Sequence, residues 1–477
     1  MNLKKLAENL SAAMVAQTVG LTVSIVGGLL VPKALGVEEF GYWQLFIFYA
    51  SYVGFFHLGL NDGVYLVNNG KTLDEMDKSS TISQFKLGLT YQAVFAGLIV
   101  GSVLVTYPGR ERTFVLIMTA ACLLIGNTID YFGYVFQAAN ETRRYSQAIV
   151  IGQLLYFVSL VLLLALGVRE FEAYVLCFVL AKICALGFTL YHARSFLAAR
   201  PLPFLAALSA VRGSIGIGSK LMIANIAAAL TVGVVRFVID DRWDIVVFGK
   251  VSFALSLATM LLAFVSQISM VLSPALRHSG AEYVVRFYTR AKKLLDVVLP
   301  SVYLMYFPVR VLVGLWLPRY EESLLWFAVF LPMCVFNART TVMSTTYYRV
   351  LRKERDMLAV NVGSVAVSGV CAAVGGYVYH SLGFVVGAAV VAGGIRSIVS
   401  EVQLSRYMNA KLSSMMLGQV LIACVFVACL LTTGPWTALL ATGGVYAAYL
   451  VVYGDATRDL VRQAQRLGRS MYRVSGG

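Results

Sequence analysis

Eight lysine and arginine residues lie inside or at the edges of the long apolar runs of this 477-residue chain: Lys86, Lys182, Lys220, Arg236, Lys250, Arg310, Arg339 and Arg396. If these runs cross a membrane, a charge near the bilayer centre costs roughly 2.5–3.5 kcal/mol even on the most lenient scale. Such residues usually face a cavity or a charged partner. A basic membrane interior therefore predicts a site for an anionic ligand.

Position along each run separates the stronger candidates from the weaker ones. Lys86 and Lys220 lie near the basic ends of their runs, where a long side chain reaches the interface. Lys250 and Lys33 lie near the opposite membrane boundary. Their positions fit both a side chain that reaches the interface and one that faces a cavity. Contact with an anionic substrate is predicted for six cations: Lys33, Lys182, Arg236, Arg310, Arg339 and Arg396.

Two carboxylates in the same runs, Asp62 and Asp130, are candidates for binding a coupled proton or sodium ion. Asp62 could equally be a counter-ion or a cap near the interface, and His57, about one turn earlier, is a weaker candidate. For Arg236, Arg310 and Arg339 the alternative to a cavity is structural pairing, with Asp62, with Asp130 or with a helix end.

Other motifs in the sequence give little support for catalysis. The segment 213–220 (GSIGIGSK) lacks the lysine directly after the second glycine that a phosphate loop requires. Asp240, Asp241 and Asp244 match a magnesium-binding spacing once, but a solvated acidic loop is favoured. The four histidines are scattered and the seven cysteines lie in apolar runs without metal spacing. We expect a protein that is not an enzyme and needs no metal or cofactor.

The elements that must position these charges are membrane-spanning helices. The chain is 59% hydrophobic and 13% charged, with a mean hydropathy of +0.77, which excludes an ordinary soluble domain. Fourteen apolar segments approach the ~20 residues that a helix needs to cross a bilayer: 11–32, 41–66, 82–106, 113–138, 146–167, 171–192, 216–238, 245–271, 294–316, 322–345, 358–379, 382–404, 413–433 and 436–454.

The loops between these segments are strongly asymmetric in charge. Twenty-five of the 39 lysines and arginines fall on one side and six on the other, which predicts cytoplasmic N- and C-termini. All five tryptophans fall at the opposite ends of the segments or in outer loops, as expected for interfacial residues. The net charge of +15 favours contact with anionic membrane lipids over nucleic acid.

The connection 193–215 is the longest and divides the segments into two halves of six, with two more at the end. We predict an N-lobe at 1–200, a C-lobe at 201–410, two further helices at 411–454 and a basic cytoplasmic tail at 455–477. Two lobes of equal orientation would enclose a central cavity. Glycine pairs at 59/63, 97/101 and 383/387 would permit close helix packing, and Pro300, Pro308 and Pro332 could kink their helices.

Three local motifs resemble the Wzx-type polysaccharide flippases of the multidrug/oligosaccharidyl-lipid/polysaccharide exporter superfamily. They are 30–43 (LVPKALGVEEFGYW), 59–63 (GLNDG) and 136–145 (FQAANETRRY). The resemblance implies an all-α polytopic protein with two six-helix lobes, a cationic lumen and no ATPase activity. It implies export of an undecaprenyl-pyrophosphate-linked oligosaccharide, such as an O-antigen, capsule or exopolysaccharide unit, across the bacterial inner membrane by alternating access. A polysaccharide polymerase or other biosynthesis proteins would be possible partners.

Two alternatives remain open from the sequence. One is a cation-coupled multidrug antiporter of the same superfamily, although drugs are commonly cationic and this interior is basic. The other is a membrane-embedded polysaccharide polymerase, although such an enzyme is expected to carry a large polar loop and every loop here is short.

Overall fold

The computed structural model describes residues 3–277, 281–410 and 415–454, and the predicted basic tail at 455–477 lies outside them. The described residues form helices and turns without a strand, which confirms the all-α class. Twelve of these helices have the length and apolar composition to cross a membrane. A shorter apolar helix and a broken second segment correspond to the other two of the fourteen predicted spans.

The chain divides into two compact units. Unit 1 comprises Met1–Ile226 and Trp243–Ser252. Its helices are α1 (Leu3–Ala34), α2 (Val37–Ala50), η1 (Val53–His57), α3 (Leu60–Asn68), α4 (Lys78–Thr106), α5 (Arg110–Ala138), α6 (Thr142–Ala165), α7 (Phe171–His192), α8 (Arg194–Leu197), the first part of α9 (Phe204–Arg242) and the start of α10 (Ile245–Arg277).

Unit 2 comprises Ala227–Arg242 and Phe253–Gly477. Besides the remainders of α9 and α10, it contains α11 (Ala281–Val298), η2 (Leu299–Met305), α12 (Tyr306–Trp316), η3 (Pro318–Tyr320), α13 (Ser323–Arg339), η4 (Thr340–Thr345), α14 (Thr346–Val350), α15 (Glu354–Ala373), η5 (Val374–Val378), α16 (Leu382–Tyr407), α17 (Met415–Thr432) and α18 (Pro435–Val452).

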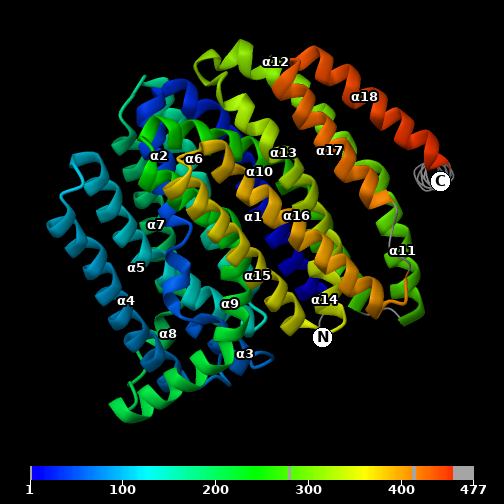
Figure 1. Cartoon of the computed structure of the whole chain (residues 1–477). Helices are drawn as coiled ribbons and strands as arrows, with labels where there is room; N and C mark the ends of the chain where they lie inside the picture. Colours follow the sequence, from blue (N-terminus) through cyan, green and yellow to red (C-terminus); the bar gives the residue numbers. More distant parts are fainter. Residues whose placement is uncertain (1–2, 278–280, 411–414, 455–477) are drawn as a thin grey trace, which may run out of the picture. The chain divides into compact units, whose positions relative to one another are not determined.

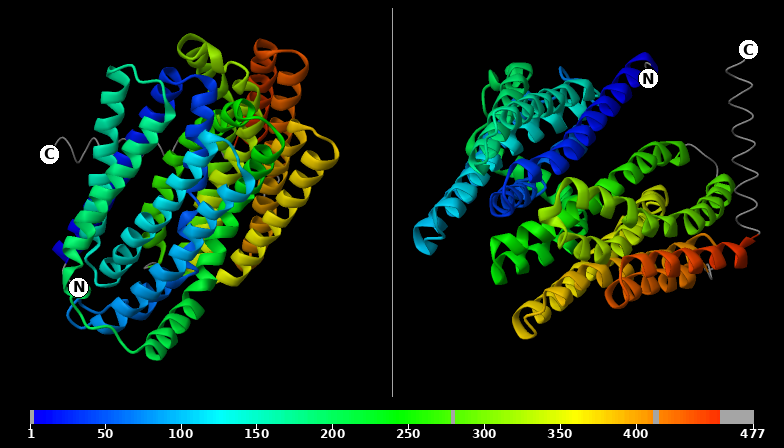
Figure 2. Two further views of the ribbon diagram at one scale, coloured as in Figure 1. Left: turned by 90° about the vertical axis from the view of Figure 1, so that its left-hand side faces the viewer. Right: turned by 90° about the horizontal axis from the view of Figure 1, so that it is seen from above.

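Helices that follow one another along the chain pack as neighbours within each unit. In unit 1, α4 lies beside α5, and in unit 2, α15 lies beside α16 (Figure 1). The last two helices, α17 and α18, also run side by side in both further views (Figure 2). Short connections favour this antiparallel packing of neighbours.

The division between the units lies within α9, after Ile226, and differs from the predicted boundary at residue 200. The connection predicted at 193–215 is also more helical than expected, because α9 begins at Phe204, directly after Pro201 and Pro203. Glycine weakens an isolated helix, yet Gly213, Gly216 and Gly218 all lie inside α9. Gly218 serves helix packing there.

A close backbone contact holds α3 against the first part of α9. Gly59, with φ of +87°, precedes α3, and a Cβ there would lie 2.6 Å from the backbone nitrogen of Ser219. A Cβ on Gly63 would collide with the carbonyl group of Ser214. These contacts confirm the predicted packing role of the pair 59/63. The pairs 97/101 and 383/387 have open space at the Cβ positions.

The Gly63→Ala substitution is expected to destabilise the protein by about 1–3 kcal/mol, the usual cost of overpacking. The added methyl group would meet backbone rather than a flexible side chain, so α3 and α9 would have to separate. Thermal unfolding of the purified protein in detergent measures the effect. Gly97→Ala in α4 is the matched control, because its Cβ would meet no atom within 4 Å. Equal melting temperatures for the two variants would contradict the packing described here.

Proline and local geometry explain the interruptions of two spans. The second span is broken because α2 ends at Ala50, and the chain passes through η1 and the left-handed Leu58 and Gly59 before α3. The ninth span changes to a 3-10 helix at Leu299–Met305, whose second residue is Pro300, because proline lacks the amide donor that an α-helix needs. Pro332 lies inside an uninterrupted α13.

A hydrogen bond from backbone to side chain connects α2 to α7 within unit 1. The backbone N–H of Phe171 donates to Glu39 Oε2 at 2.8 Å. Burial raises the pKa of Glu39, and the nearby Glu172, Glu38 and Glu170 raise it further, while the bond from Phe171 opposes the shift. The hydrogen bond therefore joins the first turn of α2 to the start of α7.

Candidate functional site

Arg339, one of the six predicted substrate contacts, is the centre of a buried ion cluster in unit 2. Its guanidinium lies 2.7 Å from Asp296 Oδ1 and 2.6 Å from Glu401 Oε2. Lys292 Nζ lies 2.8 Å from Glu401 Oε1. Arg339 also donates to Gln419 Oε1 at 2.9 Å, and Gln419 donates to the Asp296 side chain at 3.1 Å. We call these five residues the ion cluster.

Four helices supply the ion cluster. Lys292 and Asp296 come from α11, Arg339 ends α13 at the start of the π-helical segment η4, Glu401 is on α16 and Gln419 is on α17. The four charged residues are each at most 6% exposed. Two positive and two negative side chains make the cluster formally neutral, which limits the large cost of burying charge.

The space beside the ion cluster is small. The cavity that Lys292, Arg339 and Glu401 share with Tyr288 and Ser344 has a volume of about 10 Å³, room for no more than about one water molecule. The structure therefore gives Arg339 the structural pairing that was the alternative at the sequence level. Its partners are Asp296 and Glu401 rather than Asp62, Asp130 or a helix end.

Sequence reasoning overlooked the other members of the ion cluster. Lys292 was assigned to a cytoplasmic loop, because the helix that carries it begins before the predicted span 294–316. Asp296 and Glu401 fall inside predicted spans, as Asp62 and Asp130 do. An inventory of every acid in the apolar runs would have offered both as partners for Arg339.

Arg310 and Arg236 differ in surroundings. Arg310, on α12, lies 3.3 Å from Glu321 at a partly exposed position, and this pair lines an apolar hollow with Phe307 and Trp436. Arg310 therefore also has a carboxylate partner. Arg236 is half-buried in the part of α9 that belongs to unit 2. Lys33 is exposed in the last turn of α1.

Among the described residues, Arg396, another predicted site residue of unit 2, contacts an amide rather than a carboxylate. It is half-buried on α16, and its Nη2 donates to Asn337 Oδ1 of α13 at 3.1 Å. Within the described part of the chain, no carboxylate lies within 4 Å of its guanidinium nitrogens, and its Nε has no hydrogen-bond partner. A cation held in this way keeps donors for an anionic ligand.

Unit 1 brings together two other predicted site residues, Asp130 and Lys182. Tyr145 of α6 donates to Asp130 Oδ1 of α5 at 2.9 Å. Lys182 of α7 interacts electrostatically with Asp130 and lies 5.6 Å from the centre of the Phe178 ring. Three neighbouring helices therefore contribute to one polar site inside an apolar unit.

Asp62 lies in a second polar group near the first. It is 3% exposed, and its Oδ2 lies 3.7 Å from His57 Nε2. His57 Nδ1 accepts the backbone N–H of Gly59 at 2.9 Å, so a neutral His57 carries its proton on Nε2 and directs it toward Asp62. Tyr134 of α5 interacts electrostatically with both Asp62 and Asp130. The two predicted ion-coupling carboxylates are thus near the same tyrosine.

The amide of Asn61, next to Asp62, is fully buried, and neither its oxygen nor its nitrogen has a hydrogen-bond partner. A buried, unpaired amide is costly. Together with the neighbouring Asp62 carboxylate, it offers oxygen ligands for a small cation. Among the described residues, no group of three His, Cys, Asp or Glu side chains is placed to hold a metal ion.

Comparisons with known proteins identify the fold. No family model matches the sequence, and no curated protein matches it. The structure is similar to the inward closed conformation of the lipid II flippase MurJ, with a TM-score of 0.65 and 12% identity over 95% of this chain and 99% of that one. It is also similar to an inward-facing multidrug resistance MATE transporter of the MOP superfamily, with a TM-score of 0.57 and 13% identity over 84% of this chain and 98% of that one.

These similarities and the apolar helices establish a multi-pass membrane protein with the fold of the MOP-superfamily transporters. At 12–13% identity the likeness is one of fold.

Proposed function

We propose that this protein is a Wzx-type flippase that moves an undecaprenyl-pyrophosphate-linked oligosaccharide from the cytoplasmic to the periplasmic leaflet of the bacterial inner membrane. The observation that carries the proposal is a MurJ-like fold over 95% of the chain combined with a half-buried arginine, Arg396, that no carboxylate of the described residues contacts. A pyrophosphate is the kind of anion that a guanidinium binds well. The protein works by alternating access, with both termini in the cytoplasm.

Within this proposal the predicted cations have different roles. Arg396 and Arg236 bind the anionic part of the substrate, and Lys182 with Asp130 responds to the coupling ion. Arg339 stabilises unit 2 through the ion cluster. Arg310 and Lys33, predicted as contacts from the sequence, act as secondary contacts near the ends of their helices.

Asp130→Asn is expected to slow transport by at least about ten-fold, a loss of roughly 1.4 kcal/mol of coupling. The amide keeps the size of the side chain and its bond to Tyr145, but it can neither release a proton nor balance Lys182. Transport in proteoliposomes with and without an imposed proton or sodium gradient measures the change. Asp74→Asn, an exposed loop acid paired with Lys78, is the control. A gradient response that survives in Asp130→Asn would remove Asp130 from the coupling.

Loss of the gene in its own host tests the proposed substrate. Cells without the protein should lose a surface glycan and accumulate its lipid-linked repeat unit in the cytoplasmic leaflet, where periplasmic enzymes do not reach it. A host that keeps every surface glycan would refute the proposal. A polysaccharide polymerase or other biosynthesis protein that acts on the exported unit is the expected partner.

The MATE similarity keeps a cation-coupled multidrug antiporter as a second candidate. The match extends over 84% of this chain, compared with 95% for the flippase. A drug-resistance assay in a pump-deficient host separates the two, because a flippase should leave drug sensitivity unchanged. The polymerase alternative is tested by incubating the purified protein with lipid-linked repeat units, which a transporter should leave at their original length.

A further inference from the structure

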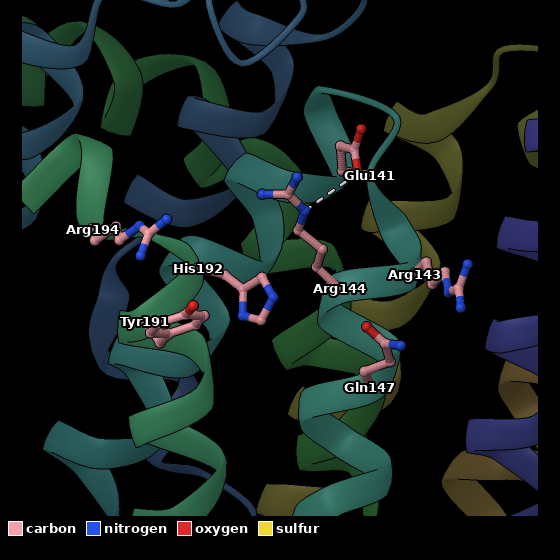
Figure 3. Close-up of a pocket in the computed structure, with 7 residues that line it drawn as sticks. All are labelled: Glu141, Arg143, Arg144, Gln147, Tyr191, His192 and Arg194. Atoms are coloured by element: carbon pink, nitrogen blue, oxygen red, sulfur yellow. Dashed lines mark ion pairs between the residues drawn. The ribbon is translucent and has the colours of Figure 1, made fainter.

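A pocket rich in arginine opens at one end of unit 1 and shares no residue with the polar sites described above. It is lined by Arg143, Arg144 and Gln147 from the first turns of α6, by Tyr191 and His192 from the end of α7, and by Arg194 (Figure 3). Its volume is about 420 Å³. We call it the basic pocket. Its arginines belong to loops that the charge asymmetry assigns to the cytoplasmic side.

The charges of the basic pocket favour an anion. Three guanidinium groups and a single carboxylate line it, and that carboxylate, Glu141, pairs with Arg144 at 3.3 Å. Guanidinium groups therefore outnumber carboxylates among the residues that line the pocket. The α6 helix also begins here without a side-chain cap, and its first amide groups and dipole add to the positive potential.

Local contacts hold several of these side chains in place. The Arg194 guanidinium lies 5.0 Å from the centre of the Tyr191 ring. His192 Nδ1 donates to the carbonyl oxygen of Phe188 at 3.0 Å, and the two rings are 4.3 Å apart. Figure 3 shows the His192 ring between Arg194 and the α6 residues Arg144 and Gln147. The pocket is therefore built from ordered groups on two helices rather than from a free loop.

An apolar groove adjoins the basic pocket and shares two of its residues, Arg143 and Gln147. Val150 and Ile151 of α6, Phe188 of α7 and Val15 of α1 line it, and its volume is about 560 Å³. Val15 is 55% exposed, so the groove opens at the surface of unit 1. A polar, cationic compartment thus continues directly into an apolar one.

We propose that the basic pocket and the apolar groove together bind an anionic phospholipid, with the phosphate headgroup among the arginines and an acyl chain in the groove. Basic pockets between membrane helices on the cytoplasmic side are suited to acidic headgroups. A free phosphate would fill only the first compartment, and an uncharged lipid would offer the arginines no anion. The bound lipid joins α1, α6 and α7 and so stabilises unit 1. This site shares no residue with the proposed transport site and does not depend on the proposed function.

Lipid binding to the full-length protein in detergent tests the proposal. Native mass spectrometry and thermal unfolding are compared after addition of phosphatidylglycerol, of phosphatidylcholine and of inorganic phosphate alone. Phosphatidylglycerol should remain bound and raise the melting temperature, phosphatidylcholine should do so weakly, and phosphate alone should not. In the Arg143→Ala/Arg194→Ala variant, retention of phosphatidylglycerol should fall by about ten-fold or more.

The matched control is Arg200→Ala/Arg212→Ala, which removes two exposed arginines of unit 1 from the same predicted side but outside the pocket. It should retain phosphatidylglycerol as the unmodified protein does. Because Arg143 and Arg194 are both exposed, their loss should leave the lipid-free melting temperature within about 1 °C of the original, since surface substitutions change stability little.

Three results would overturn the proposal. One is equal retention of phosphatidylglycerol by the pocket variant and the control variant. The second is equal retention of phosphatidylglycerol and phosphatidylcholine by the unmodified protein. The third is stabilisation by inorganic phosphate alone as large as that by the lipid, which would remove the apolar groove from the site. None of these results depends on whether the protein transports a glycan.

Discussion

Replacing Arg339 with alanine should destabilise the protein by about 3–5 kcal/mol, the usual cost of removing one partner from a buried ion pair. The substitution would remove the guanidinium that contacts Asp296 and Glu401, both deep inside unit 2, and would keep the contact of Glu401 with Lys292. Most of the protein should then be lost from the membrane fraction. Size-exclusion chromatography and thermal unfolding in detergent measure the loss.

Arg310→Ala is the matched control, since Arg310 also faces one glutamate but at a partly exposed position. An exposed pair contributes roughly 0–1 kcal/mol, so this variant should remain folded. A compensated variant, Arg339→Met with Asp296→Asn, should recover part of the stability, because Asp296 then loses its charge together with Arg339 while the pair of Lys292 and Glu401 remains. If Arg339→Ala were as stable as Arg310→Ala, the ion cluster would not be the structural centre described here.

Replacing Arg396 with alanine should lower transport by at least about thirty-fold, because a charge-assisted hydrogen bond in a desolvated site is worth roughly 2 kcal/mol or more. The arginine has no carboxylate partner within the described residues, so its removal should leave no unpaired acid. Protein levels in the membrane should therefore stay close to normal. Arg396→Lys should retain part of the activity, since it keeps the charge but loses the planar donor group.

Arg406→Ala serves as the control for Arg396→Ala, because it removes an exposed arginine from the last turn of the same helix. It should transport as the unmodified protein does. Normal transport by Arg396→Ala would show that this arginine does not bind the substrate, and the proposal would then rest on Arg236 alone.

Much of the fold could be predicted from hydropathy and charge. The apolar segments of about 20 residues mark nearly every helix, because the bilayer forces each crossing to satisfy its own backbone hydrogen bonds. The helix that begins at Phe204, within the connection 193–215, could not be predicted in this way. Glycines weaken an isolated helix, and of Gly213, Gly216 and Gly218 it is Gly218 whose close contact with α3 has a packing role.

The sequence predicted which types of residue form the candidate site, but not which of them contact one another. A buried cation in an apolar run is visible in the sequence, whereas its partner depends on which helices pack together. Arg339 and Arg396 look alike on that basis. In the structure, Arg339 contacts two carboxylates, one from α11 and one from α16. Among the described residues, Arg396 contacts an asparagine from α13 and no carboxylate. Spacing along one helix carries no information about such contacts between helices.

The central claim is that the protein translocates a lipid-linked oligosaccharide, and transport in proteoliposomes tests it most directly. Vesicles that contain the purified protein and lipid-linked repeat units from its host are treated from outside with a glycosidase that does not cross the membrane. The account predicts that units starting in the inner leaflet become accessible with the unmodified protein, and at least about thirty-fold more slowly with Arg396→Ala. Units that stay protected in vesicles containing the unmodified, folded protein would contradict it.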